Sequence, residues 1–278
     1  MRTETTRQSA AIFAANRARG AVRFDVRGFG GVTRRGELHE AGSLRVRFPS
    51  PEDEGLSAVL VNTAGGIAGG DRFDVGIAAS AGARLTVTTA AAEKVYRAEG
   101  QPAELNISLK AEGRSHLSWL PQETILFDRV RIHRRFDIDL SEGASLLLCE
   151  ILVLGRVAMG EQMSAGEIFD RWRLTRAGKL VFAENIRLSG NLGEKLRQPA
   201  VASGGVAVGM ALIVPGDEAL VERIRQLAPS FRGEVGISAW NGFAMARFCA
   251  QDAGKLRADM MAVLGRSSPG ALPRLWLN

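Results

Sequence analysis

The feature that most constrains this chain is the alternation of side chains over residues 130–140. Apolar side chains occupy the even positions and charged ones most of the odd positions, and only Arg134 interrupts the apolar row. A period of two is typical of a β-strand that buries one face and leaves the other in water. The stretch therefore predicts a half-buried strand.

Similar alternation recurs along the chain, each time followed by a glycine turn and a second apolar alternation. The turn glycines are Gly82, Gly113, Gly143 and, in a looser copy, Gly178, which lie 31, 30 and 35 residues apart. We interpret each unit as a strand, a short turn and a returning strand, a hairpin that cannot bury its apolar face alone. Stacked neighbours can bury it together, although an ordinary meander of hairpins shows similar turns.

The C-terminal part has a different pattern. A strand over 206–214 is followed by a helix for which Asp217 is the expected N-cap, then by strands over 235–240 and 243–249 and a helix from near Asp252. We therefore predict a mainly β fold of stacked, β-helix-like strand-turn-strand units with a small C-terminal α+β portion. The predicted divisions are a mobile basic tail (1–20), a β-rich repeat region (21–200) and an α+β portion packed on it (201–278).

Composition favours a packed intracellular protein. Hydrophobic residues make up 46% of the chain, which is enough for a core, and the two cysteines, Cys149 and Cys249, form no zinc or disulfide pattern. No secretory signal is visible, and no run approaches the roughly 18 apolar residues of a membrane span. We expect a cytoplasmic protein with no membrane partner.

Positive charge is concentrated at the N-terminal end. Residues 1–50 hold ten arginines against four acidic residues, and the net charge of the chain is +6. This excess fits an acidic partner or nucleic acid, and it equally fits a solvated, arginine-biased surface.

The chain carries none of the common catalytic motifs. The chain has no P-loop, no G-x-S-x-G elbow and no H-E-x-x-H helix, and its three histidines lie far apart. Carboxylates are numerous, and two of them could act as acid and base or bind a divalent cation, but their spacing picks out no pair. They include Glu123, Asp128, Glu150, Glu161 and Glu167.

Two glycine pairs form the most unusual stretch, Gly65-Gly66 and Gly69-Gly70, which Asp71 follows. Such a segment can cradle a phosphate or make a tight structural bend. The Rossmann pattern fails here because the segment leads into a strand and not a helix.

Five segments of the chain share the residue patterns of one known family. One is the tail 272–276. The other four are the glycine-rich segment with Gly65, Gly66, Gly69 and Gly70; the segment with Thr88, Thr89, Lys94, Tyr96 and Arg97; the segment with Trp119 and Gln122; and the segment with Gly155, Arg156 and Gly160. Together they resemble the urease accessory proteins of the UreD type, called UreH in some organisms. The similarity spans about residues 25–276, and one departure is Thr63-Ala64, where many members have two prolines.

The resemblance implies a non-catalytic scaffold. Such proteins join the UreF-type accessory protein and the GTPase UreG and dock on apo-urease, where nickel is inserted. The family fold is mainly β, with strands wound in a helix-like stack. No tightly bound cofactor and no nucleic acid are implied, and nickel would be a transient cargo.

The family segments also suggest where nickel would travel. We hypothesise that Asp71, Glu123 and Glu161 line the nickel route or the partner surface, while a salt bridge such as Glu161 with Arg156 is the alternative for each. Trp119 is expected in the core. Pro121 should end its strand and place Gln122 and Glu123 at a bend from which side chains reach outward.

Two other functions stay open. A β-solenoid carbohydrate-active hydrolase would use two carboxylates in a long groove with aromatic platforms, yet aromatic residues are only 6% of this chain. A basic nucleic-acid-binding module would bind with a steep dependence on salt and without a protein partner.

Overall fold

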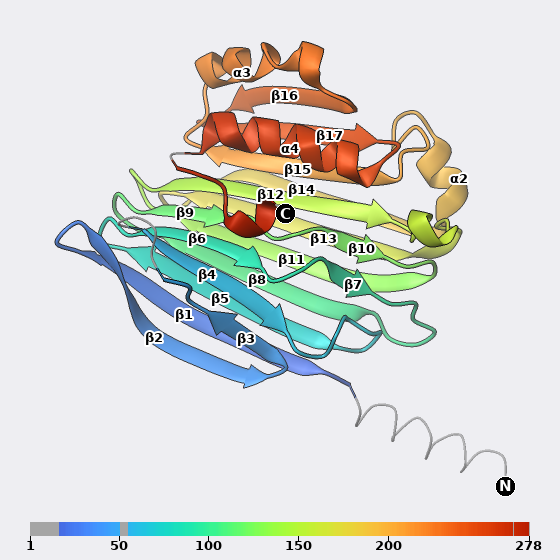
Figure 1. The fold of residues 1–278 in the computed structure, drawn as a ribbon, viewed down its shortest axis with the longest axis horizontal. Helices are drawn as coiled ribbons and strands as arrows, with labels where there is room; N and C mark the ends of the chain where they lie inside the picture. Colours follow the sequence, from blue (N-terminus) through green and yellow to red (C-terminus); the bar gives the residue numbers. More distant parts are fainter. Residues whose placement is uncertain (1–16, 51–54, 269, 278) are drawn as a thin grey trace, which may run out of the picture.

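Two β-sheets face each other in this computed structural model, and two helices, α3 (Glu218–Arg225) and α4 (Ala253–Ser267), lie beyond the second sheet (Figure 1). The structure describes residues 17–50, 55–268 and 270–277. The first sheet has the spatial order β14 (Lys179–Asn191), β13 (Ala165–Arg176), β11 (Val130–Leu140), β8 (Ala103–Ala111), β5 (Arg72–Ser80), β1 (Arg19–Phe29) and β2 (Val32–Gly42).

The second sheet has more strands than the first. Its order is β16 (Glu234–Trp240), β17 (Phe243–Ala250), β15 (Ala207–Val214), β12 (Ser145–Leu154), β9 (His116–Trp119), β6 (Arg84–Thr89), β4 (Leu56–Asn62) and β3 (Leu44–Arg47), with β10 (Thr124–Leu126) paired to β12 and to β7 (Glu93–Val95). The remaining elements are the helix α2 (Leu192–Arg197) and three short 3₁₀ turns, η1 (Val157–Met159), η2 (Ala228–Ser230) and η3 (Arg274–Trp276).

The chain winds between the two sheets in stacked coils. It passes from β5 to β6, β8, β9, β11, β12 and β13, entering the first and second sheets in turn, and like strands of successive coils pair in parallel. The register places Val75, Ile107, Phe136 and Trp172 side by side across four neighbouring strands. The fold is therefore mainly β and β-solenoid-like, as the repeat predicts.

The hairpin interpretation of the repeat is wrong for three units. The strands before and after Gly82, Gly113 and Gly143 do not pair with each other, because each turn carries the chain from one sheet to the other. Only the copy around Gly178 is a true hairpin, in which β13 and β14 pair antiparallel. A hairpin within one sheet and a turn that crosses to the opposite sheet have the same sequence pattern, since both bury one face of each strand.

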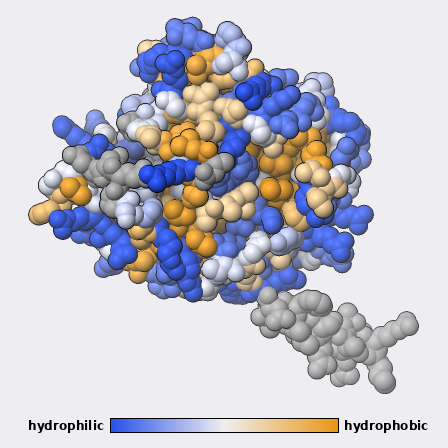
Figure 2. All heavy atoms as spheres, viewed as in Figure 1, coloured by the Kyte–Doolittle hydropathy of each residue, from blue (hydrophilic) through white to orange (hydrophobic). Residues whose placement is uncertain are grey.

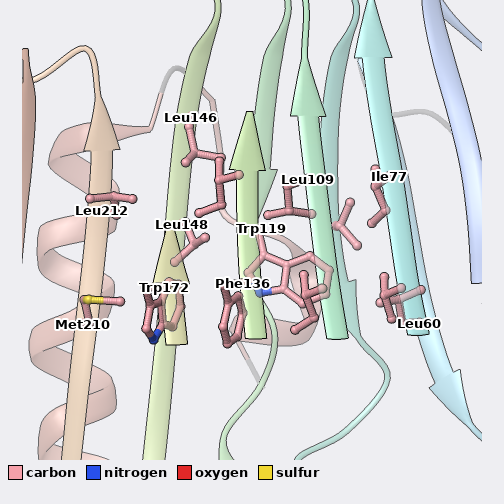
Figure 3. Packing of buried hydrophobic residues seen from close by; sticks show 14 of the residues in the cluster. Leu60, Ile77, Leu109, Trp119, Phe136, Leu146, Leu148, Trp172, Met210 and Leu212 are labelled. Atoms are coloured by element: carbon pink, nitrogen blue, oxygen red, sulfur yellow. The ribbon is translucent and has the colours of Figure 1, made fainter. Parts of the chain in front are cut away.

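Apolar side chains from both sheets fill the space between them (Figure 3). Phe136 and Trp172 stack with ring centroids 3.7 Å apart and planes within 3°. Figure 3 places Trp119 beside them, and Trp119 is 4% exposed, so the prediction that it belongs to the core is confirmed. Burial of each such ring stabilises the fold by about 1.5–3 kcal/mol.

The C-terminal strands and helices form where the sequence predicts them. Asp217 accepts a hydrogen bond from the Leu220 amide and Asp252 one from the Lys255 amide, both at 2.8 Å, so each caps its helix. β15 pairs antiparallel with β12 and thereby extends the second sheet. A second core lies between this part of the sheet and the two helices.

The predicted basic tail lies mostly outside the described residues, which begin at residue 17. Of its described residues, Arg19 and Gly20 belong to β1, where Gly20 pairs with Gly42 and Phe73. Within the described part of the chain, no helix is long and apolar enough to cross a membrane.

Candidate functional site

The connections that return from the second sheet to the first lie along one edge of the coils. We call this edge, formed by residues 63–71, 90–102, 120–129 and 155–164, the motif edge, because four of the five family segments reach it. Backbone hydrogen bonds join neighbouring connections: the amide of Ile67 donates to Lys94, that of Phe127 to Val95, and that of Gly155 to Leu126, over 2.7–3.0 Å. Segments that are about 30 residues apart in the sequence thus form one surface.

The glycine-rich segment makes a tight bend against Tyr96. Gly66 has a φ of +143°, and a Cβ added there would lie 2.5 Å from the Tyr96 ring. The Tyr96 hydroxyl donates to the Gly65 carbonyl at 2.7 Å, and its ring meets Phe127 edge-on at 5.1 Å. Gly69 packs on Ala98. These contacts account for a tight structural bend at Gly66 and Gly69, where an added side chain would clash.

The segment with Thr88 and Thr89 holds the connection 120–129 in place. The Thr89 hydroxyl accepts a hydrogen bond from the backbone N–H of Gln122 at 2.9 Å, and the neighbouring Thr88 is buried. Lys94 and Arg97 are exposed at the motif edge, where they give it positive charge.

The last connection is fixed by an ion pair. Arg156 donates to Glu161 at 2.6 Å and lies over the Phe127 ring, 4.2 Å from its centroid. The hydrogen bond from Arg156 lowers the pKa of the Glu161 carboxyl, which also accepts from the Asp128 amide. Gly160 ends η1 with a φ of +71°. This turn leaves Met159 75% exposed.

The structure does not bring the three hypothesised carboxylates together. Asp71 is buried and accepts from the amides of Ala18 and Ala68, Glu123 pairs with Arg257 at 2.7 Å, and Glu161 pairs with Arg156. Each has a structural partner of its own. Their part in nickel transfer stays a prediction.

The expectation that Gln122 and Glu123 reach outward is wrong. Gln122 is 8% exposed, and Arg257 donates to both side chains and to the carbonyls of residues 275 and 276. Trp276 is buried, and its indole N–H donates to the Leu120 carbonyl at 2.9 Å. Arg257 thus joins two family segments 150 residues apart. Sequence reasoning missed it because it lies on a helix outside both segments.

A cavity of about 340 Å³ enters the space between the sheets from the motif edge. Its mouth includes Gly65, Gly66 and Lys94, and its inner wall includes Trp119 and Glu150. Glu93 lines it as well. Burial raises the pKa of the Glu93 carboxyl, whose side chain accepts a hydrogen bond from Asn62.

A buried ionic cluster lies at the inner end of this cavity. Arg134 is 2% exposed and donates to Asp170 through two nitrogens and to Glu150 at 2.8 Å. The Trp119 indole N–H donates to the other oxygen of Glu150 at 2.9 Å. Burial raises the pKa of Glu150. The one break in the apolar row of 130–140 was the sequence signal for this cluster.

A second cavity, of about 680 Å³, lies on the other side of the cluster. Arg134, Glu150 and Asp170 line it, and it extends to Glu234 and Arg247. Across the described part of the chain, no group of three or more His, Cys, Asp or Glu side chains is arranged to hold a metal ion.

Comparison with known proteins decides the family. The model of the UreD urease accessory protein family matches residues 16–277. The chain belongs to the UreD family. It is 73% identical over 278 residues to a urease accessory protein UreD of Bradyrhizobium diazoefficiens, with both chains fully covered. It is 71% identical over 270 residues to one of Rhodopseudomonas palustris strain BisB18, covering 97% of this chain and 98% of the relative.

We expect Glu93→Gln to stabilise this UreD-family chain at neutral pH. Because the folded-state pKa of Glu93 is raised, the folded protein holds the proton more tightly, and stability falls as pH rises from the ordinary carboxyl value of about 4.3 to the raised one. Glutamine has no charge to bury. Urea unfolding should therefore show a higher midpoint for the variant at pH 7.5 and equal midpoints below pH of about 4. Equal midpoints at both values would contradict this account.

Proposed function

We propose that this chain is a non-catalytic scaffold of urease maturation in the cytoplasm. With the UreF-type protein and the GTPase UreG it docks on apo-urease and supports the insertion of nickel. Membership of the UreD family carries the accessory role, since the curated relatives are named urease accessory proteins.

The two cavities support a route for nickel through the chain. Glu150 lines both of them, and each has further carboxylates, Glu93 in the first and Asp170 and Glu234 in the second. Ni²⁺ accepts carboxylate oxygen and imidazole ligands, and a cargo ion must be held weakly enough to leave. Single carboxylates spaced along a route suit such a transfer.

The buried cluster argues against a hydrolase. Glu150 and Asp170 are the carboxylates that face one another across the sheets, and both accept hydrogen bonds from the same guanidinium. A glycosidase needs one of its two carboxyl groups protonated beside the substrate. All four oxygens of these two carboxyl groups already accept a hydrogen bond from Arg134 or from the Trp119 indole, so neither group is left to act on a substrate.

The motif edge supports partner contacts. It combines exposed apolar side chains of η1, Val157 and Met159, with the exposed cations Lys94 and Arg97. Figure 2 shows that hydrophobic residues also gather near the centre of the face that carries α4. Exposed apolar groups ringed by polar ones are typical of protein interfaces.

The test is co-expression of a urease operon with and without this chain, with the nickel content of purified urease measured by elemental analysis. We expect omission of the chain to remove most of the nickel. We expect Met159→Glu to act in the same way and to abolish co-purification with the accessory complex or with apo-urease, because it places a charge on the motif edge.

Leu180→Glu is the matched control, since Leu180 is an exposed apolar residue (53%) on β14, away from the motif edge. Both changes should alter stability by no more than about 0.5 kcal/mol, as surface substitutions do. Full nickel content without the chain would overturn the proposed function. Normal nickel content and complete co-purification with Met159→Glu would overturn the assignment of the motif edge.

A further inference from the structure

A third cavity, of about 560 Å³, lies at the edge of the coils opposite the motif edge, where the turns with Gly82, Gly113 and Gly143 carry the chain to the second sheet. It is lined by His116 and Ser145, the first residues of β9 and β12, and by the segment 213–217 that leads from β15 to α3. Its volume lies in the range of about 300–1,000 Å³ that binding sites for whole small molecules occupy.

Three arginines from three different elements line this cavity. Arg176 is the last residue of β13, Arg223 lies in α3 and Arg266 lies in α4. Among the described residues that line the cavity, Asp217 is the one acidic residue. Burial and, less strongly, Arg84 lower the pKa of His116, so this ring adds no charge at neutral pH. Three guanidinium groups against one carboxylate leave an excess of two positive charges.

The arginines have few protein partners. Within the described part of the chain, none of the three forms an ion pair with an acidic side chain. Arg176 makes one long hydrogen bond, to the Gly242 carbonyl at 3.4 Å. In contrast, Arg225 lies two residues after Arg223 on the same helix and pairs with Glu218 at 3.0 Å. A guanidinium has five N–H donors, so those that line the cavity keep most of theirs for a ligand.

The dipoles of the two helices do not explain this arrangement by themselves. Arg223 and Arg266 lie in the last turns of α3 and α4, where a cation offsets the partial negative charge of the helix end. That effect acts on each helix separately. It does not require the two arginines to line one cavity together with Arg176 of the first sheet.

We propose that this cavity binds a phosphorylated small molecule, whose phosphoryl groups are held by Arg176, Arg223 and Arg266. The planar guanidinium fork matches phosphate oxygens in a bidentate manner. A diphosphate carries enough negative charge to offset both excess positive charges, whereas a single carboxylate does not. Val214 and Leu220 also line the cavity and would contact the rest of the molecule. This inference does not depend on the role in urease maturation.

The test is isothermal titration calorimetry of the full-length chain with pyrophosphate and with ADP at one fixed ionic strength, because salt screens such contacts. We expect both to bind. Arg223→Gln and Arg266→Gln should each weaken binding about tenfold or more, the effect of losing a hydrogen bond between charged groups. The double variant should show no measurable binding. Because both residues are exposed, the unfolding midpoints should stay close to that of the native chain.

Arg225→Gln is the matched control. It removes the same charge from the same helix, but Arg225 does not line the cavity and its side chain is 49% exposed. Its dissociation constants for pyrophosphate and ADP should equal those of the native chain. A variant at this position therefore separates a built site from the general attraction of an arginine-rich surface.

Four results would overturn the proposal. They are the absence of pyrophosphate and ADP binding to the native chain, unchanged binding in the Arg223→Gln, Arg266→Gln double variant, an equal loss in Arg225→Gln, and equal affinity for sulfate and pyrophosphate. Tighter binding of a single-stranded oligonucleotide than of ADP, lost in Arg223→Gln, would overturn the assignment to a small molecule. None of these results bears on the nickel content of urease, which tests the proposed function separately.

Discussion

Arg134→Ala should leave the protein with little or no stable folded state. The substitution strands Glu150 and Asp170, both buried, without their common cation. Removal of one partner from a buried ion pair costs about 3–5 kcal/mol, because a charge is left in a low-dielectric interior. That is a large part of the roughly 5–15 kcal/mol that holds a typical domain folded. Soluble yield and the urea unfolding midpoint measure the effect.

Arg131→Ala is the control for this prediction. Arg131 lies on the opposite face of the same strand and pairs with Glu167 at 2.7 Å, but its side chain is 37% exposed. An exposed pair contributes at most about 1 kcal/mol, so this variant should stay soluble and close to the native midpoint. Equal midpoints for the two alanine variants would show that burial does not set the strength of the Arg134 contacts.

Trp276→Ala should cost about 3–5 kcal/mol, the range for removal of a buried tryptophan. Its side chain is 1% exposed, its indole N–H donates to the Leu120 carbonyl, and Arg257 lies over its ring at 4.7 Å. The change therefore opens a cavity and also frees Arg257, which holds Glu123. Denaturant unfolding checks the loss, and limited proteolysis should show earlier cleavage near residue 270.

Leu277→Ala provides the comparison, because the neighbouring Leu277 is 64% exposed. Its effect should stay within about 0.5 kcal/mol. If Trp276→Ala unfolds at the same denaturant concentration as Leu277→Ala, the C-terminal segment is not the structural tie that its contacts indicate.

The local pattern of side chains was enough to predict the strands and helices named above and much of the motif edge. Alternation over 130–140 predicts β11 from its first residue to its last, and Asp217 and Asp252 predict the starts of α3 and α4. These predictions succeed because side-chain period and helix capping depend on residues within one or two turns of chain. The family segments likewise identify the connections that form the motif edge.

The sequence by itself determined that the chain is β-rich, where its turns fall and to which family it belongs. Only the tertiary structure decided that Gly82, Gly113 and Gly143 lead to the opposite sheet, since strand pairing depends on partners about 30 residues away. It also decided that Arg134 meets Glu150 and Asp170, 16 and 36 residues further along. A single charged residue in an apolar row signals a buried partner, but only the stacking of coils shows which carboxylates supply it.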